Sequence, residues 1–248
     1  MLEVAVIDRM GSTRLAGRIA LVTGASRGIG WMIARTLAET GADVILAARS
    51  RDELEKNAVE IESMGRRVRA VPTDLTQQAD IDALFEQATA FGDVDLLVNN
   101  AALIESGAMI DMEPDRWNAV VDAGLRGTYA VTRAFLPGMM KRGRGDIVMI
   151  SSTSGKRSNH GATAYSATKF GLMGLSHALV YEARKKNVRV IVVSPSRVDT
   201  RRLPAESLTE GGKGALLRME DVAEAVVFAV SLPGRALVRE IELWGTNP

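Results

Sequence analysis

The stretch Thr23-Gly24-Ala25-Ser26-Arg27-Gly28-Ile29-Gly30 decides the fold, because an apolar run precedes it and a helical pattern follows it. Its glycines are spaced as G-x-x-x-G-x-G rather than as the more familiar G-x-G-x-x-G. Gly24 permits a tight turn, the glycines let the backbone approach a pyrophosphate, and the helix N-terminus presents unpaired N–H groups. The stretch therefore predicts a phosphate-binding loop at the start of a βαβ unit. The alternative is a plain strand-to-helix turn that uses glycine for its geometry.

Outward from this loop, short apolar runs alternate with helical segments, which is typical of an α/β protein with a parallel sheet. The runs are continuously apolar, as strands covered by helices on both faces should be. We expect a single Rossmann-type, doubly wound, parallel seven-stranded sheet flanked by helices. The predicted strands are residues 19–23, 43–48, 68–72, 94–99, 146–151, 188–194 and 240–243, and the predicted helices are residues 30–40, 52–64, 77–91, 114–141, 161–186 and 220–232.

The chain of 248 residues fits one α/β domain. We expect residues 1–14 to form an N-terminal extension and residues 15–248 to form the single domain. Residues 195–218 are the one long connection without clear periodicity, and connections of that length inside a compact domain are usually functional. We interpret them as a substrate lid.

Composition excludes several classes of protein. Lysine and arginine number 31 against 30 aspartates and glutamates, so the basic excess that a nucleic-acid binder needs is missing. There is no cysteine and there are only two histidines, so we expect no metal site. The N-terminus lacks the basic region of a signal peptide, and no apolar run approaches the ~20 residues that span a bilayer. We expect a cytoplasmic protein with no membrane partner.

The tip of the second predicted strand bears on the choice of cofactor. It reads Ala47-Ala48-Arg49-Ser50, without the carboxylate that would bind the ribose 2′-hydroxyl of NAD. Arg27 and Arg49 instead offer two guanidinium groups whose fork geometry suits a 2′-phosphate. NADP is therefore favoured; the alternative is that both arginines are solvated surface residues.

An acid–base pair lies on the long helix predicted at residues 161–186. Tyr165 and Lys169 are four residues apart and so share one helical face. A nearby cation favours the phenolate, and lowering a phenol pKa by about three units corresponds to roughly 4 kcal/mol. Tyr181 and Lys185 repeat the spacing, but Tyr181 lies about 160° around the helix and ~24 Å further along. Only Tyr165 can share a site with Ser152 at the carboxyl edge of the sheet, where ligands bind.

At these residues the chain resembles the short-chain dehydrogenase/reductase family in its NADP-using form, across about residues 15–243. The resemblance rests on the phosphate loop, on Asp74, on Asn99-Asn100-Ala101, on Ser152 thirteen residues before Tyr165, and on Lys169. It implies hydride transfer between a nicotinamide and a carbonyl or carbinol carbon of a small molecule. It also implies that the protein is a homodimer or homotetramer, with helices 114–141 and 161–186 at the interface.

The resemblance also implies a role for each site residue. Tyr165 would exchange the proton with the substrate oxygen, Ser152 would hydrogen-bond that oxygen, and Lys169 would lower the tyrosine pKa and bind the nicotinamide ribose. The implied cofactor-binding residues are Gly24, Ser26, Arg27, Gly28, Ile29, Gly30, Arg49, Asp74, Leu75, Asn99, Ala101, Tyr165, Lys169, Pro195, Val198 and Thr200.

The sequence departs from the family pattern at three places. Gly124-Leu125-Arg126-Gly127 replaces the usual N-L-x-G, so the asparagine that anchors a proton-relay water in relatives is missing. Ala102 and Ser196 each replace a glycine beside the cofactor. Glycine in mid-helix also favours a local kink. We expect a Gly124→Asn variant to fold and to turn over at least as fast.

Two narrower or rival functions remain open. A 3-oxoacyl-thioester reductase would use the basic residues of 195–218 to meet an acidic acyl carrier protein. A non-catalytic NADP-binding regulatory protein is suggested by Gly124, although the presence of Ser152, Tyr165 and Lys169 together weighs against it.

Overall fold

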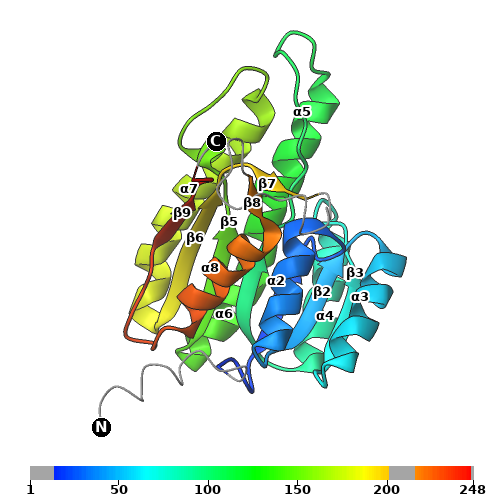
Figure 1. The fold of residues 1–248 in the computed structure, drawn as a ribbon, viewed down its shortest axis with the longest axis vertical. Coiled ribbons are helices and arrows are strands. Elements are labelled where there is room, and N and C mark those ends of the chain that lie inside the picture. The colour runs from blue at the N-terminus through cyan, green and yellow to red at the C-terminus, as the bar shows by residue number, and fades with distance from the viewer. Residues whose placement is uncertain (1–13, 201–215, 247–248) are drawn as a thin grey trace.

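The computed structural model describes residues 14–200 and 216–246 and contains one parallel sheet of seven strands in the order β3-β2-β1-β4-β5-β6-β9 (Figure 1). Every neighbouring pair is parallel, which confirms the predicted doubly wound fold. The strands are β1 (Ile19–Thr23), β2 (Asp43–Ala48), β3 (Val68–Pro72), β4 (Val94–Asn99), β5 (Gly145–Ile150), β6 (Val188–Pro195) and β9 (Glu240–Leu243).

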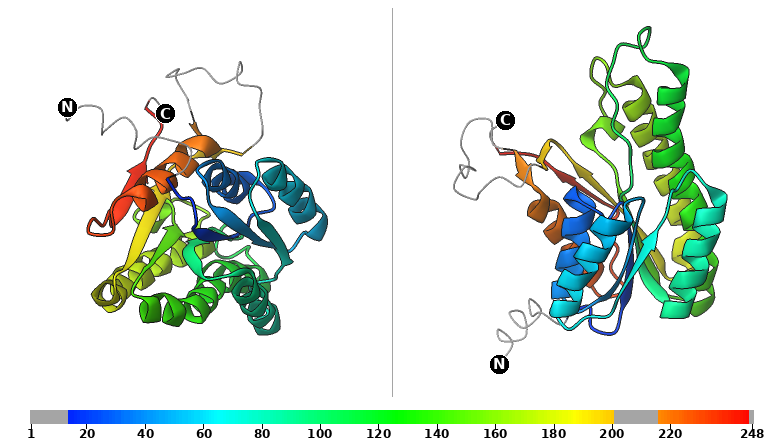
Figure 2. Two further views of the ribbon diagram at one scale, coloured as in Figure 1. Left: turned by 90° about the horizontal axis from the view of Figure 1, so that it is seen from below. Right: turned by 90° about the vertical axis from the view of Figure 1, so that its right-hand side faces the viewer.

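Helices cover both faces of this sheet (Figure 2). One face carries α2 (Gly28–Glu39), α3 (Arg51–Ser63) and α8 (Met219–Ser231), and the other carries α4 (Gln78–Phe91), α6 (Gly127–Arg142) and α7 (Thr163–Ala183). None of the helices within 14–200 and 216–246 is long and apolar enough to cross a membrane.

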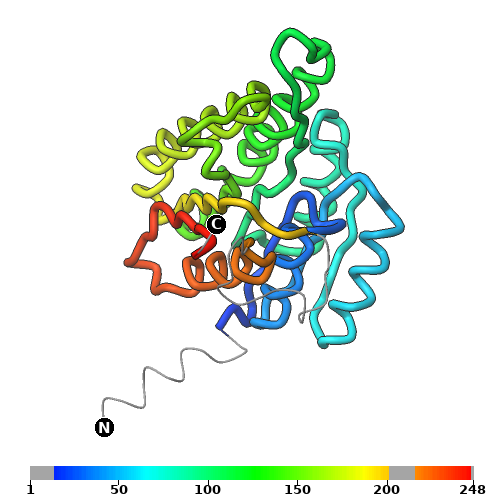
Figure 3. Tube along the Cα trace, turned by 45° about the horizontal axis from the view of Figure 1, so that its top comes forward, coloured from blue at the N-terminus to red at the C-terminus, as the bar shows by residue number. Residues whose placement is uncertain are grey.

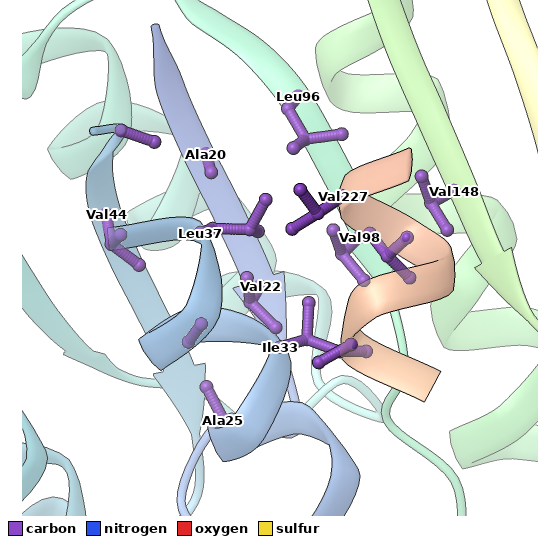
Figure 4. Packing of buried hydrophobic residues seen from close by; sticks show 14 of the residues in the cluster. Ala20, Val22, Ala25, Ile33, Leu37, Val44, Leu96, Val98, Val148 and Val227 are labelled. Atoms are coloured by element: carbon purple, nitrogen blue, oxygen red, sulfur yellow. The ribbon is translucent and has the colours of Figure 1, made fainter. Parts of the chain in front are cut away.

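Successive residues of each central strand enter opposite cores. Ala20 and Val22 of β1 pack into the core formed with α2 and α8, whereas Ile19 and Leu21 pack into the core formed with α4, α6 and α7. Figure 4 shows Ala20 and Val22 beside Leu37 of α2 and Val227 of α8. Because both faces are buried, both sets of residues must be apolar, which explains the continuous runs in the sequence.

The segment predicted as a helix at residues 114–141 is helical throughout, but it is not one regular α-helix. The chain instead forms α5 (Pro114–Val121), a π-helical turn η2 (Asp122–Arg126) and then α6. In η2 the N–H of Gly127 donates to the carbonyl of Asp122, five residues back instead of four. Such an expanded turn interrupts the regular hydrogen-bond ladder and is a known cause of kinks.

A short parallel pair that the sequence did not predict joins the two ends of the 195–218 connection. Val198 of β7 (Val198–Asp199) lies opposite Leu217 of β8 (Leu217–Arg218). The predicted lid between them, like the predicted N-terminal extension, falls mostly outside the described residues, so both remain predictions.

A buried ion-pair network joins strands at the amino edge of the sheet. The Asp146 carboxylate, 3% exposed, accepts hydrogen bonds from Arg189 Nε at 2.5 Å and from Arg18 Nη2 at 2.6 Å. Arg189 also donates to the carbonyl of Val230 at 3.0 Å, at the end of α8. The network therefore fixes β5, β6 and α8 relative to one another.

We expect Asp146→Ala to lower the free energy of unfolding by about 3 kcal/mol or more, because it leaves two guanidinium groups without their anion. The matched control is Asp93→Ala. Asp93 forms an ion pair with Arg142, but the Asp93 side chain is 63% exposed. Its loss should therefore cost below about 1 kcal/mol. Urea denaturation measures both. Equal losses in the two variants would contradict the structural role of the network.

Candidate active site

The predicted site residues follow the carboxyl ends of β1, β4, β5 and β6, at one edge of the sheet. The segment that leads into α5 extends beyond this edge (Figures 1 and 3). It is tied to the start of α7 by a hydrogen bond from the N–H of Gly107 to the carbonyl of Gly161, at 2.9 Å. The edge therefore carries the phosphate loop, the segment that leads into α5 and the start of α7, which bears Tyr165.

The glycines of the phosphate loop are required for two reasons, a positive φ angle and close packing. Gly24 and Gly28 have positive φ angles of 68° and 63°, which L side chains rarely adopt. A Cβ on Gly30 would lie 2.3 Å from the carbonyl oxygen of Gly24, whereas a Cβ on Gly28 would meet no atom within 4 Å. The loop is thus closely packed beneath Gly24 and Gly30 and open above Gly28, which fits a bound phosphate.

The loop presents donors on its open side. Across the described residues, the backbone N–H groups of Ser26, Arg27, Gly28, Ile29 and Gly30 form no well-aligned hydrogen bond, which is expected of the last four at the N-terminus of α2. These groups are the components of an anion site.

The two arginines expected to bind a 2′-phosphate flank this loop. The side chains of Arg27 and Arg49 are exposed, and neither forms an ion pair or hydrogen bond within residues 14–200 and 216–246. Arg27 precedes α2, and Arg49 follows the tip of β2. Both guanidinium groups are therefore available to an external anion.

Asn100 is a functional residue that the sequence reasoning missed. Its Nδ2 donates to the carbonyls of Thr23 at 3.1 Å and Gly24 at 3.3 Å, and its N–H donates to Thr23 Oγ1 at 3.0 Å. The N–H of Ala101 donates to the same hydroxyl at 3.2 Å. Asn100 therefore fixes β4 to the phosphate loop; its position inside the Asn99-Asn100-Ala101 motif was the available signal.

The other predicted cofactor residues fall at the same edge, but not all of their side chains face it. Asn99 is buried and donates from Nδ2 to Thr132 Oγ1 at 3.0 Å, so its side chain is engaged in the interior. Asp74 accepts hydrogen bonds at Oδ1 from the N–H and the hydroxyl of Thr76, at 2.9 and 2.8 Å. Asp74 therefore also stabilises the turn that precedes α4.

The remaining predicted cofactor residues lie in neighbouring loops. Leu75 packs against Gly127, where a Cβ would lie 2.7 Å from the Cβ of Leu75. Pro195 ends β6, Val198 begins β7, and Thr200 is the last residue described before the 201–215 gap.

The structure brings Ser152, Tyr165 and Lys169 together. Ser152 follows β5, and its Oγ accepts a hydrogen bond from the N–H of Ser154 at 3.1 Å. Its hydroxyl is near enough to that of Tyr165 to lower the phenol pKa. Lys169 is 3% exposed, and its Nζ donates to the carbonyl of Ile150 at 2.8 Å and lies 5.6 Å from the centroid of the Tyr165 ring.

The protonation of this group differs from the expectation. Burial raises the pKa of Tyr165 above its ordinary value, although the nearby Ser152 hydroxyl partly opposes the shift. Burial also lowers the pKa of Lys169 to about 8. The phenol pKa thus shifts in the opposite direction to that inferred from the i, i+4 spacing, because desolvation is the largest influence on Tyr165 and the Lys169 ammonium binds a backbone carbonyl.

The second tyrosine–lysine pair lies elsewhere, as its helical angle predicted. Tyr181 is 58% exposed, and its ring faces the guanidinium groups of Arg184 at 5.4 Å and Arg239 at 5.8 Å. Within the described residues no group of three or more His, Cys, Asp or Glu side chains could hold a metal ion.

The packing around Gly124 argues against the expected tolerance of an asparagine there. Gly124 lies in η2 and faces α7, where a Cβ would sit 2.6 Å from Thr168 Cγ2. Thr168 is 1% exposed and immediately precedes Lys169. The methyl group of Thr168 therefore fills the space that a side chain at position 124 would need, and an asparagine can enter only if the Thr168 side chain or α7 moves.

Comparisons with known proteins agree with this geometry. The family model described as short chain dehydrogenase matches residues 18–210. An uncharacterized oxidoreductase of Staphylococcus aureus (strain MRSA252) is 36% identical over 230 residues, covering 92% of this chain and 97% of the relative.

Two solved structures are similar over almost the whole chain. A metagenomic short-chain oxidoreductase in complex with NADP has a TM-score of 0.83 and 33% identity, covering 95% of this chain and 100% of the other. The alcohol dehydrogenase from the archaeon Thermococcus sibiricus, complexed with 5-hydroxy-NADP, has a TM-score of 0.84 and 28% identity, with 93% and 97% covered.

We now expect Gly124→Asn to lower the free energy of unfolding by about 1–3 kcal/mol, because the site is already filled. Displacement of α7 should also lower kcat by about tenfold or more. Adding Thr168→Ser, which removes the obstructing methyl group, should restore most of both losses. Urea denaturation and turnover measurements on the single and double variants give the interaction energy between positions 124 and 168.

Gly174→Asn is the matched control, because Gly174 lies on α7 and a Cβ there would meet nothing within 4 Å. A Gly124→Asn variant as stable and active as the control would refute the packing argument, and so would a double variant no better than Gly124→Asn alone.

Proposed function

Because the chain belongs to the short-chain dehydrogenase family of oxidoreductases, we propose that it uses NADP to interconvert a carbonyl compound and a secondary alcohol. The observation that carries this proposal is the convergence of Ser152, Tyr165 and Lys169 at the sheet edge that also holds the phosphate loop. The bound nicotinamide would supply or accept the hydride.

The loop and the two arginines support NADP as the cofactor. The free N–H groups of residues 26–30 would hold the pyrophosphate, and the space above Gly28 would admit it. Arg27 and Arg49 would hold the 2′-phosphate, since both are exposed and without protein partners among the described residues. Two similar solved structures contain NADP or a derivative of it.

The protonation states of these residues are those that carbonyl reduction requires. Because its pKa is raised, Tyr165 keeps its proton at neutral pH and can donate it to a substrate oxygen that gains negative charge. Ser152 Oγ already accepts the N–H of Ser154, so its own proton is free to be donated to Tyr165 or to the substrate oxygen. With a pKa of about 8, Lys169 can gain or lose a proton near neutral pH and so resupply the tyrosine.

The narrower and rival functions depend on other features of the chain. Reduction of a 3-oxoacyl thioester depends on a basic lid, and Arg201, Arg202 and Lys213 lie outside the described residues. A non-catalytic role would leave unexplained why an acid, a hydrogen-bonding hydroxyl and a buried ammonium group meet at one point.

Exposed aromatic residues on α6 and α7, namely Tyr129 at 53% and Phe170 at 48%, support the proposed homo-oligomer with these helices at its interface.

Tyr165→Phe should lower kcat by a factor of about 10² to 10⁴, because it removes the proton donor, while NADPH binding stays nearly intact. Tyr181→Phe is the matched control and should keep near-normal turnover, since Tyr181 lies on the surface. A panel of ketones with NADPH absorbance as the signal measures turnover. If both substitutions reduced turnover equally, Tyr165 would lose its assigned role.

NADPH should bind at least about tenfold tighter than NADH, which corresponds to roughly 1.4 kcal/mol. Arg49→Ala should remove much of this preference by weakening NADPH alone. Arg51→Ala serves as the control, because Arg51 is nearby but lies 3.6 Å from its partner Glu55. Fluorescence titration of both cofactors decides; an unchanged NADPH-to-NADH ratio in Arg49→Ala would exclude Arg49 from recognition of the 2′-phosphate.

A further inference from the structure

Asn57 is a polar residue on the buried face of α3. It lies between Leu54 and Ile61 at helical spacing and is 3% exposed, while both of those neighbours are 0% exposed. Burying an amide among apolar side chains is unfavourable unless its hydrogen bonds are made. The position therefore calls for a specific partner.

The partner is the phosphate loop. Asn57 Nδ2 donates to the carbonyl of Ala25 at 3.0 Å and to the carbonyl of Ser26 at 3.0 Å. Asn100 Nδ2 donates to the two preceding carbonyls, those of Thr23 and Gly24. Two asparagine amides, from α3 and from the end of β4, thus bind four consecutive carbonyl oxygens of the loop.

These contacts determine where the N–H groups of the loop point. A trans peptide unit is planar, with its N–H directed opposite to its carbonyl oxygen. Because Asn57 binds the Ala25 and Ser26 carbonyls from within the fold, the N–H groups of Ser26 and Arg27 are directed away from α3. These are two of the N–H groups that have no acceptor among the residues the structure describes.

We propose that Asn57 is a positioning residue for cofactor binding, which orients the Ser26 and Arg27 N–H groups toward the pyrophosphate. This inference rests on the proposed NADP site. Asn57 does not touch the cofactor; it acts through the backbone of the loop. Without its amide, the two peptide units lose their fixed orientation, and the cofactor must order them when it binds.

A merely structural role for Asn57 leads to a different expectation. If the amide only anchored α3, its loss would lower stability and leave the affinity for cofactor unchanged. Ile61 supplies the comparison, since it lies on the same buried face of α3 one turn beyond Asn57, and no contact joins it to the loop carbonyls.

The experiment measures the Kd of NADPH and of NADH by fluorescence titration, together with Tm, for wild type, Asn57→Leu and Ile61→Val. Leucine keeps the branched shape of asparagine but donates no hydrogen bond. We expect Asn57→Leu to raise both Kd values about tenfold or more and by similar factors, since both cofactors share the pyrophosphate. We expect Ile61→Val to lower Tm and to leave both Kd values within about twofold of wild type. Asn57→Ala provides the same comparison if the leucine variant does not fold.

Two results would overturn the proposal. Kd values of a folded Asn57 variant within about twofold of wild type would show that the amide has a structural role only. A loss confined to NADPH would assign Asn57 to the 2′-phosphate instead of the pyrophosphate. Failure of the wild-type protein to bind either cofactor is a separate outcome, because it would refute the proposed function itself.

Discussion

The burial of every central strand on both faces is the constraint on which the rest of the structure depends. With helices packed against both sides, the strands leave no polar surface along their length, and ligand chemistry is confined to the edge where the chain leaves the sheet. Ser152 follows β5, Asn100 follows β4, and the phosphate loop follows β1. The parallel order brings these three points together, so residues far apart in sequence meet without a long connecting loop. The opposite edge carries the Asp146 network and is devoted to stability.

The strands could be predicted almost to the residue, because a continuous apolar run bounded by turns has few other interpretations in an α/β pattern. The ends of the helices predicted at residues 30–40 and 52–64 were also correct to within one residue, and the glycines that follow them, Gly41 and Gly65, have positive φ angles. The π-helical turn at Asp122–Arg126 could not be predicted, since a shift from four to five residues in hydrogen bonding leaves no apolar periodicity of its own. The glycine at position 124 indicated a kink but not its kind.

Within the site, the sequence predicted which residue types meet but not how each side chain is used. The i, i+4 spacing of Tyr165 and Lys169 places the two on one helical face, yet the ammonium group finds the carbonyl of Ile150 at the end of β5. That contact depends on the packing of α7 against β5, which no local pattern contains. Asn57 had a readable signal, a polar residue on an apolar stripe, but its partners in the phosphate loop lie about thirty residues away and required the fold.

The backbone N–H groups of the phosphate loop and the side chains of Arg27 and Arg49 have different proposed roles in cofactor binding. The asparagine amides hold the carbonyls from below, so the orientation of the N–H groups does not depend on the side chains of Arg27 and Arg49. Those arginines are exposed and carry no structural contact within the described part of the chain. Recognition of the pyrophosphate and recognition of the 2′-phosphate are therefore physically separable. On the proposed roles of Arg49 and Asn57, a change at the tip of β2 would alter the preference between NADP and NAD without disturbing the loop, whereas a change in α3 would alter the loop for both cofactors.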